Sequence, residues 1–113
     1  MKEIKAIFNE ARLFAVLTSL RDMPGIPGMW MSDVRVFPRG HADPKTSSHG
    51  IDALDSFMMV KVECVVKDEH AAAVVAAIQQ AAHTGNANDG KIFVSPVEEV
   101  VKVQTGERGD AAV

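Results

Sequence analysis

The sequence has little of three features that would each define a class of protein: cysteine, clustered positive charge and long apolar runs. Its single cysteine, Cys64, cannot form an internal disulfide, and we interpret it as a small buried side chain of a strand. The net charge is −3 and no four basic residues adjoin, which argues against nucleic acid as a main partner. The apolar runs are far shorter than the roughly 18 to 20 residues of a membrane span, and charges near the N-terminus argue against a signal peptide. We therefore expect a cytoplasmic protein that does not insert into a membrane.

Recognisable catalytic and metal-binding patterns are also missing from the sequence. The four histidines lie on predicted loops and helix ends, without a serine or cysteine partner at a spacing typical of nucleophilic catalysis. No C-x-x-C or H-x-x-x-H motif occurs, and His41 with His49 in one polar segment is a weak pair of metal ligands. The sequence therefore predicts a protein that is not an enzyme and that has no metal site.

The pattern of apolar residues predicts one α+β domain that spans residues 1–113. The chain is 47% hydrophobic, which is enough for one modest core. Asn9 and Asp68 can cap two helices, and Gly85 can end the second of them. Segments with strand-like composition or a two-residue period lie at 2–8, 29–37, 57–66, 91–97 and, as a short edge piece, 99–104. The order β-α-β-β-α-β is that of the ferredoxin-like fold, in which two helices cover one face of an antiparallel sheet.

The other face of the predicted sheet needs a cover as well. The strands carry more large apolar side chains than two helices can bury, namely Trp30, Met31, Met58, Met59, Phe93 and Val94. We therefore expect the protein to associate with itself. The segment 38–56 is polar, contains glycine and proline and shows no regular period. A loop of this length in a compact domain is usually functional or disordered.

The stretch "HTGNANDGKIFV", residues 83–94, connects a predicted helix to a predicted strand and is rich in small and amide residues. Backbone N–H groups in such a turn can point together at an anion, and Lys91 can add a positive charge, so the stretch suits a phosphate chain. A helix stop followed by an Asp-Gly turn would use the same residues. The pattern alone leaves both interpretations open.

Three motifs in the sequence resemble the PII signal-transduction family. They are "MKEIKAIF" at the start, "TGNANDGKIFVSPVEE" at 84–99 and "TGERGDAAV" at 105–113, and the register agrees along the whole chain with one extra residue in "DMPGIPGM". The resemblance implies a homotrimer of ferredoxin-like subunits with an adenine nucleotide in each cleft between neighbours. It implies a phosphate loop at 84–91 and a segment at 102–113 that reaches the cleft from the next subunit. It also implies a mobile effector loop at 38–56 that engages a target, often a membrane transporter.

The resemblance implies a nucleotide site that this sequence matches in part. Retained or neighbouring positions are Val36, Phe37, Arg39, Glu63, Val65, Asn88, Asp89, Gly90 and Lys91. Trp30 replaces a threonine that contacts the adenine, and it can either stack on a base or fill the sheet surface. Lys102 and Gln104 replace two arginines that hold the outer phosphates. Since a bidentate fork and a charge are lost, we expect ADP or AMP to bind at least as well as ATP.

The effector loop departs further from the nitrogen-sensing members of the family. Gly40 replaces a glutamine that orients magnesium and 2-oxoglutarate, Met59 replaces a lysine that pairs with a 2-oxoglutarate carboxylate, and the chain has no tyrosine to be uridylylated. We therefore expect weak or absent 2-oxoglutarate binding. Phosphorylation of Ser47 or Ser48 is an alternative modification, although serines in polar loops are usually solvated.

These departures favour a regulator linked to inorganic carbon, with a transporter or a carboxysome-linked protein as its target. A small anion such as bicarbonate would need one cation and a few N–H donors, which Arg39 with the Gly40–His41 backbone can supply. A nitrogen sensor that binds ATP with 2-oxoglutarate and a regulator of heavy-metal efflux are the alternatives. An ATP-hydrolysing enzyme is disfavoured, since no magnesium carboxylate beyond Asp89 and no base can be assigned.

Overall fold

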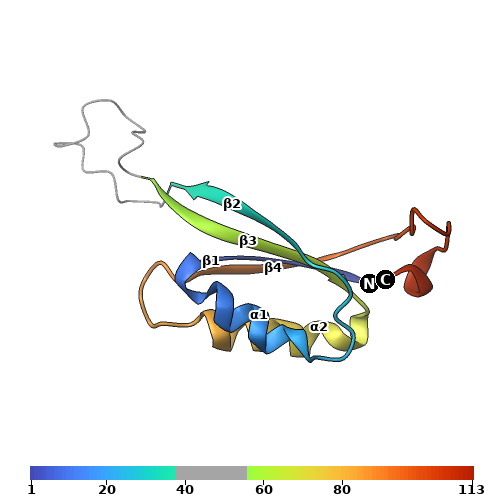
Figure 1. Cartoon of the computed structure of the whole chain (residues 1–113), viewed down its shortest axis with the longest axis horizontal. Coiled ribbons are helices and arrows are strands. Elements are labelled where there is room, and N and C mark those ends of the chain that lie inside the picture. The colour runs from blue at the N-terminus through green and yellow to red at the C-terminus, as the bar shows by residue number, and fades with distance from the viewer. Residues whose placement is uncertain (38–55) are drawn as a thin grey trace.

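The computed structural model describes residues 1–37 and 56–113, which form a four-stranded antiparallel sheet with two helices on one face (Figure 1). The strand order is β2-β3-β1-β4. The strands are β1 (Lys2–Phe8), β2 (Trp30–Val36), β3 (Phe57–Val66) and β4 (Gly90–Pro96), and the helices are α1 (Leu13–Arg21) and α2 (Asp68–Ala82). This arrangement confirms the predicted α+β ferredoxin-like fold.

The core lies between the two helices and the central strands β1 and β3. Every second residue of β1 and β3 points toward the helices, and these residues are at most 2% exposed where the helices cover them. The helices contribute one stripe each to the same cluster. The buried set is Ile4, Ala6, Phe8, Val60, Val62, Cys64 and Val66 from the sheet, and Val16, Leu20, Val74, Ile78 and Ala82 from the helices. The two-residue periods at 2–8 and 57–66 therefore match the buried positions of β1 and β3.

The two predicted helix caps have different outcomes. The side chain of Asn9 accepts a hydrogen bond of 2.9 Å from the N–H of Ala11 and opens a 3-10 turn, Glu10–Arg12, that leads into α1. Asp68, by contrast, is the first residue of α2, and Lys67 occupies the cap position without a side-chain bond. The Asp68 carboxylate instead accepts a hydrogen bond of 2.8 Å from the amino group of Met1. This happens because β1 pairs with β3, so the start of β1 lies beside the start of α2.

The predicted end of the second helix also differs from the observed one. α2 ends at Ala82, and His83 already has an extended backbone, with φ −66° and ψ 130°. Gly85 does have a positive φ of 92°, but it lies inside the following loop. Its conformational freedom therefore shapes the loop rather than the helix terminus.

The predicted short strand at 99–104 is not present as a strand. After β4 the chain leaves the sheet and forms a small hairpin that projects from the domain (Figure 1). One isolated bridge joins Val101 to Arg108, and hydrogen bonds of 2.9 and 2.8 Å between residues 102, 106 and 107 close the turn. No further strand of the described chain lies beyond this point for the segment to pair with. Val103 is 99% exposed, so the hairpin adds nothing to the core.

The part of the chain that the structure describes contains no helix that is both long enough and apolar enough to cross a membrane.

Candidate functional site

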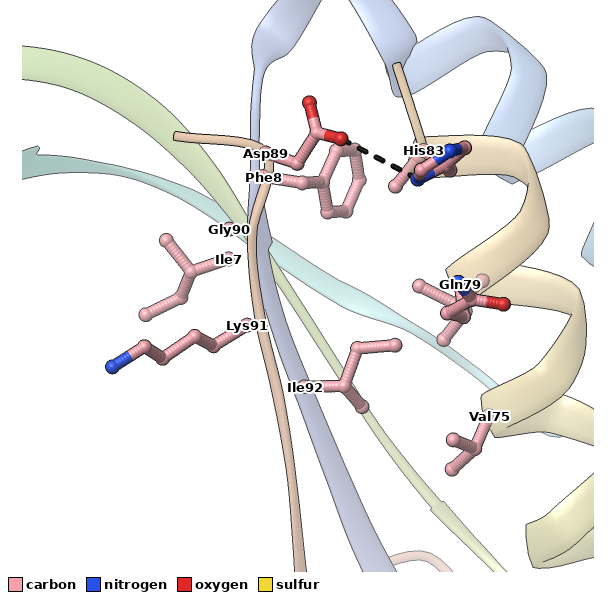
Figure 2. Close-up of a pocket in the computed structure, with 11 residues that line it drawn as sticks. Ile7, Phe8, Val75, Gln79, His83, Asp89, Gly90, Lys91 and Ile92 are labelled. Carbon is pink, nitrogen blue, oxygen red and sulfur yellow. Dashed lines mark ion pairs between the residues drawn. The ribbon is translucent and has the colours of Figure 1, made fainter. Parts of the chain in front are cut away.

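The loop between α2 and β4 is organised around the carboxylate of Asp89. This carboxylate accepts hydrogen bonds from the backbone N–H groups of Thr84, at 2.8 Å, and Gly85, at 2.9 Å, and from the Thr84 hydroxyl. The Nδ1 atom of His83 lies 3.6 Å from it (Figure 2). The hydrogen bonds from Thr84, followed by that from Gly85 and the nearby His83, hold the pKa of Asp89 below its usual value. An ionised Asp89 therefore closes the loop on itself at neutral pH.

The transition from this loop into β4 requires glycine at position 90. Gly90 has a φ of 115°, and a Cβ atom there would lie 1.9 Å from the backbone oxygen of Ile7. Gly90 is already part of β4 and pairs with Phe8. The Asp-Gly pair is therefore not the centre of a simple two-residue turn. It joins a closed loop to a strand that lies tightly against β1.

The strand register places Lys91 on the sheet face that the helices leave uncovered. Lys91 pairs with Ile7, and in Figure 2 both side chains extend to the side of the strands opposite α2. Phe8 and Ile92 extend toward α2 instead. We call the uncovered surface the open face. It contains alternate residues of all four strands, among them Lys5, Lys61 and Glu63.

A hollow of about 460 Å³ lies on the open face beside the loop, and we call it the open-face hollow. The described residues that line it are Ile7, Val36, Phe37, Phe57, Met59, Ala87, Asn88, Gly90, Lys91 and Phe93. It brings together five positions that the resemblance assigned to the nucleotide: Val36, Phe37, Asn88, Gly90 and Lys91. Lys91 is exposed and makes no ion pair with any residue in the described ranges.

Three other predicted residues lie elsewhere on the open face. Trp30 pairs with Glu63, which also pairs with Lys5, and Glu63 forms an ion pair of 3.2 Å with Lys61. Trp30 lies three strands away from Lys91, which is roughly 14 Å across the sheet. Val65 follows on β3 and is half-buried. Within one chain, Trp30 and Lys91 are therefore too far apart to contact the same chemical group of a ligand.

The remaining predicted residues belong to segments outside the sheet. Lys102 and Gln104 are exposed on the projecting hairpin, beyond the end of β4. Arg39, Gly40 and His41, which were assigned to the second anion, lie outside the described residues. The hairpin and the loop lie at opposite ends of β4.

Sequence reasoning named Met59 and Phe93 as apolar residues that need a cover, but it missed Ile7 and Phe57, which line the open-face hollow with them. Ile7 could have been found, because the two-residue period of β1 places it on the face opposite the core. The two-residue period of 57–66 also places Phe57 on that face, but its neighbour Val36 depends on the register of β3 with β2. Met59 was predicted as one of several large apolar residues in need of a cover and as a replaced lysine, and the structure shows that it is 5% exposed and lines the hollow.

A second hollow, of about 430 Å³, lies on the helix side between α2 and β4 (Figure 2). Val75, Ile78 and Ala82 of α2 face Ile92 of β4 across it. The His83–Asp89 pair closes one end, so this hollow and the open-face hollow lie on opposite sides of Gly90 and Lys91.

No group of three or more histidine, cysteine or acidic side chains suited to a metal ion occurs within 1–37 and 56–113. Cys64 is buried, and this burial raises the pKa of its thiol.

Comparison with known proteins gives consistent matches over nearly the whole chain. A family model described as Nitrogen regulatory protein P-II matches residues 1–107. The chain is 41% identical to the Nitrogen regulatory protein P-II of Azospirillum brasilense and 41% identical to that of Rhizobium meliloti (strain 1021), with 100% of both chains covered in each alignment. The crystal structure of Arabidopsis thaliana PII bound to citrate matches with a TM-score of 0.79 and 35% identity, covering 99% of this chain and 91% of that chain. The chain therefore belongs to the PII family of signal-transduction regulators.

Proposed function

We propose that this protein is a regulator that responds to adenine nucleotides, with the phosphates bound at residues 84–91. The observation that carries the proposal is that backbone N–H groups without an acceptor and a lysine without an ion pair, as judged among the described residues, lie together at one edge of the sheet. Within the described chain, the backbone N–H groups of Ala87 and Asn88 donate no hydrogen bond. Lys91 follows them at the start of β4. Such donors together with one ammonium group suit a phosphate.

Asp89 contributes to this site through the shape of the loop. Its carboxylate already accepts hydrogen bonds from Thr84 and Gly85, so we assign it no direct contact with a phosphate. The ionised carboxylate would also repel a phosphate that came close to it. We propose that Asp89 holds the loop so that the N–H groups of Ala87 and Asn88 point outward.

The substitutions on the hairpin support a preference for the less charged nucleotides. Gln104 carries no charge, and Lys102 offers a point charge in place of a planar fork. The outer phosphate of ATP would therefore contribute less binding free energy at this site than in family members that have arginines at both positions. We propose that ADP or AMP binds at least as well as ATP, in a cleft between subunits of a homotrimer, where the hairpin of one subunit can reach the loop of the next.

We propose that ligand binding changes the conformation of segment 38–56 and that a target protein recognises this change. If the nucleotide and a second small anion both prefer one state of this segment, each raises the affinity for the other. Bicarbonate is the second anion that we propose, held by Arg39 and the Gly40–His41 backbone, with a target in inorganic-carbon metabolism. This rests on analogy within the family and on the residue types of that segment.

A nitrogen-sensing role is the alternative, and it is suggested by the names of the relatives. The matched proteins of Azospirillum brasilense and Rhizobium meliloti (strain 1021) are called nitrogen regulatory proteins. Against this role stand Met59 in place of a lysine and the absence of tyrosine from the whole sequence. Binding of 2-oxoglutarate therefore distinguishes the two roles.

The test is calorimetric titration of AMP, ADP and ATP into the purified protein, repeated with saturating bicarbonate and with magnesium and 2-oxoglutarate. We expect ADP or AMP to bind and bicarbonate to tighten the binding. Lys91→Gln should weaken ADP binding at least tenfold, whereas Lys67→Gln, at a lysine before α2, should change it by less than about twofold. Tight binding of magnesium-ATP only with 2-oxoglutarate would establish the nitrogen role. Binding of no adenylate at all would overturn the proposal.

A further inference from the structure

We propose that His83 is a positioning residue of the loop at 84–91 and that it makes ADP binding tighter as the pH falls from about 8 to about 5.5. It would act through the carboxylate of Asp89, which closes the loop. This inference rests on the proposed function and adds to it a dependence on pH.

The imidazole of His83 lies at the point where α2 ends and the loop begins. The backbone N–H of His83 donates a hydrogen bond of 3.1 Å to the carbonyl of Gln79, which ties the residue to the last turn of the helix. Its Nδ1 atom lies 3.6 Å from Oδ2 of Asp89, and Figure 2 shows the two groups turned toward each other. Oδ2 is also the atom that accepts hydrogen bonds from the N–H groups of Thr84 and Gly85. His83 therefore lies beside the oxygen that closes the loop.

Protonation of His83 would strengthen this contact. At 3.6 Å the neutral imidazole is too far from the carboxylate for a hydrogen bond. The protonated imidazole has an N–H on both ring nitrogens and a positive charge, so it would attract the carboxylate and could donate to it from Nδ1. The His83 side chain is 63% exposed, so the added charge keeps its contact with water. Hydrogen bonds from Thr84 hold the pKa of Asp89 below its usual value, so the carboxylate stays ionised where histidines gain a proton.

The charge balance of residues 83–91 connects this proton to the nucleotide. Asp89 and Lys91 contribute one negative and one positive charge, so the segment is neutral with a neutral His83 and positive with a protonated one. The carboxylate of Asp89 repels a nearby phosphate, and a positive charge on His83 would offset that repulsion. The same charge would hold the loop more firmly. Both effects favour a bound phosphate, so ADP binding should be accompanied by proton uptake at His83.

The other charged groups near the end of α2 belong to the 3-10 turn Glu10–Arg12 and to β4. Arg12 donates a hydrogen bond of 2.9 Å from Nε to a carbonyl of the last turn of α2, so its positive charge opposes a proton on His83. Glu10 is exposed, and Lys91 extends to the opposite side of the strands (Figure 2). The second half of α2 has no charged side chain. Asp89 is therefore the group that favours the proton on His83, and Arg12 is the group that opposes it.

The experiment is calorimetric titration of ADP at about pH 8 and about pH 5.5 into the purified wild type, His83→Gln and His83→Arg. Dividing the affinity of the wild type by that of His83→Gln at each pH cancels the ionisation of the ADP phosphates. We expect this ratio to rise about three- to fivefold between the higher and the lower pH, as an exposed ion pair predicts. His83→Arg is charged at both values. It should bind ADP more tightly than the wild type at the higher pH and show no such rise.

Proton uptake provides a readout that a purely structural role of His83 would not change. Titrations near neutral pH in buffers of different ionisation enthalpy should show more protons taken up with ADP by the wild type than by His83→Gln. His70→Gln is the matched control, because His70 lies at the opposite end of α2. This variant should keep both the pH dependence and the proton uptake of the wild type.

Three outcomes would contradict these expectations, and they separate the inference from the proposed function. ADP binding with the same pH dependence in the wild type and in His83→Gln would overturn the inference alone. Equal loss of the pH dependence in His70→Gln and His83→Gln would also overturn it, because the effect would then not be located at the loop. Absence of ADP binding at either pH would overturn the proposed function and this inference with it.

Discussion

The two faces of the sheet are built from the same strands but have opposite characters. On the face that the helices cover, Ile4, Ala6 and Phe8 of β1 are at most 2% exposed. On the open face, Trp30 is 63% exposed and Phe93 is 47% exposed. The covered face contributes stability through burial, whereas the open face leaves apolar area and charge available for other molecules. Along β1, alternation thus assigns Ile4, Ala6 and Phe8 to the core and leaves Lys5 and Ile7 on the open face.

The open face combines charged and aromatic side chains, whereas the buried residues of the covered face are all apolar. Trp30, Glu63, Lys5 and Phe93 lie in register across the four strands. The ammonium of Lys5 lies 5.8 Å from the centre of the Phe93 ring, within the range of a cation–π contact. Such contacts are weak when exposed and can be exchanged for contacts with a ligand or a second subunit. The open face is therefore suited to association, which agrees with the self-association expected from the sequence.

The largest expected difference comes from truncating one phenylalanine on each face. Phe8→Ala should lower the free energy of unfolding by about 3–5 kcal/mol, because it leaves a cavity in a closed core. Phe93→Ala should lower it by about 1 kcal/mol or less, because much of the ring is already in water. Urea unfolding at one low protein concentration gives both values. Similar losses for the two variants would show that the open face carries as much stability as the core, and the contrast between the faces would fail.

A smaller effect on the free energy of unfolding is expected at the start of β4, where Gly90 lies against β1. Gly90→Ala should cost about 3 kcal/mol, because alanine is strained at a φ of 115° and its Cβ would meet the backbone of Ile7. Gly28→Ala is the matched control, since a Cβ there meets nothing within 4 Å, and its effect should be within about 0.5 kcal/mol. Thermal unfolding compares the two variants. Equal stabilities would mean that β4 shifts away from β1 at no cost.

The smallest effect is expected in the loop beside the open-face hollow. Since hydrogen bonds from Thr84 lower the pKa of Asp89, the ionised carboxylate holds the loop at neutral pH. This contribution is present above the usual aspartate pKa of about 3.9 and is lost as the pH falls through the lower value of the folded protein. Amide shifts of Thr84 and Gly85 in NMR spectra should therefore titrate with a midpoint below about 3.9.

Two variants check the assignment of that titration to the loop. Asp89→Asn should remove it and should speed amide exchange at Thr84 and Gly85 at neutral pH, with little effect on global stability. Asp33→Asn, on the exposed surface of β2, should leave both amides unchanged. A midpoint at or above the usual aspartate value would contradict the hydrogen-bonded loop.

Much of the fold could be predicted because its signals are local. The periods of β1, β3 and α2 identified the buried residues, and the bounds of β1 and β3 agree with the predicted 2–8 and 57–66. The prediction for Asp68 was wrong because the competing partner, the amino group of Met1, is far away in sequence. The prediction of a strand at 99–104 was wrong. Alternating apolar residues favour an extended backbone, but a strand also needs a neighbouring strand with which to pair.

The candidate site was predictable only in the part that depends on one segment. The motif at 84–91 contains the loop, the glycine and the lysine, so its residue types already pointed to an anion. The apolar wall of the open-face hollow joins β1, β2, β3 and β4, and its composition depends on which residues the register sets side by side. Met59 illustrates the limit, since the sequence shows an apolar residue in place of a lysine but not that it lines a hollow with Phe57 and Lys91.

The sequence by itself determined the order of the elements, the residues of the core and the membership in the PII family, because periodicity and motifs are properties of short segments. The tertiary structure decided that Asp89 is bonded within the loop, that Gly90 touches β1, and that Lys91 lies at the rim of an apolar hollow. These facts depend on distances between segments that only chain folding and strand register fix.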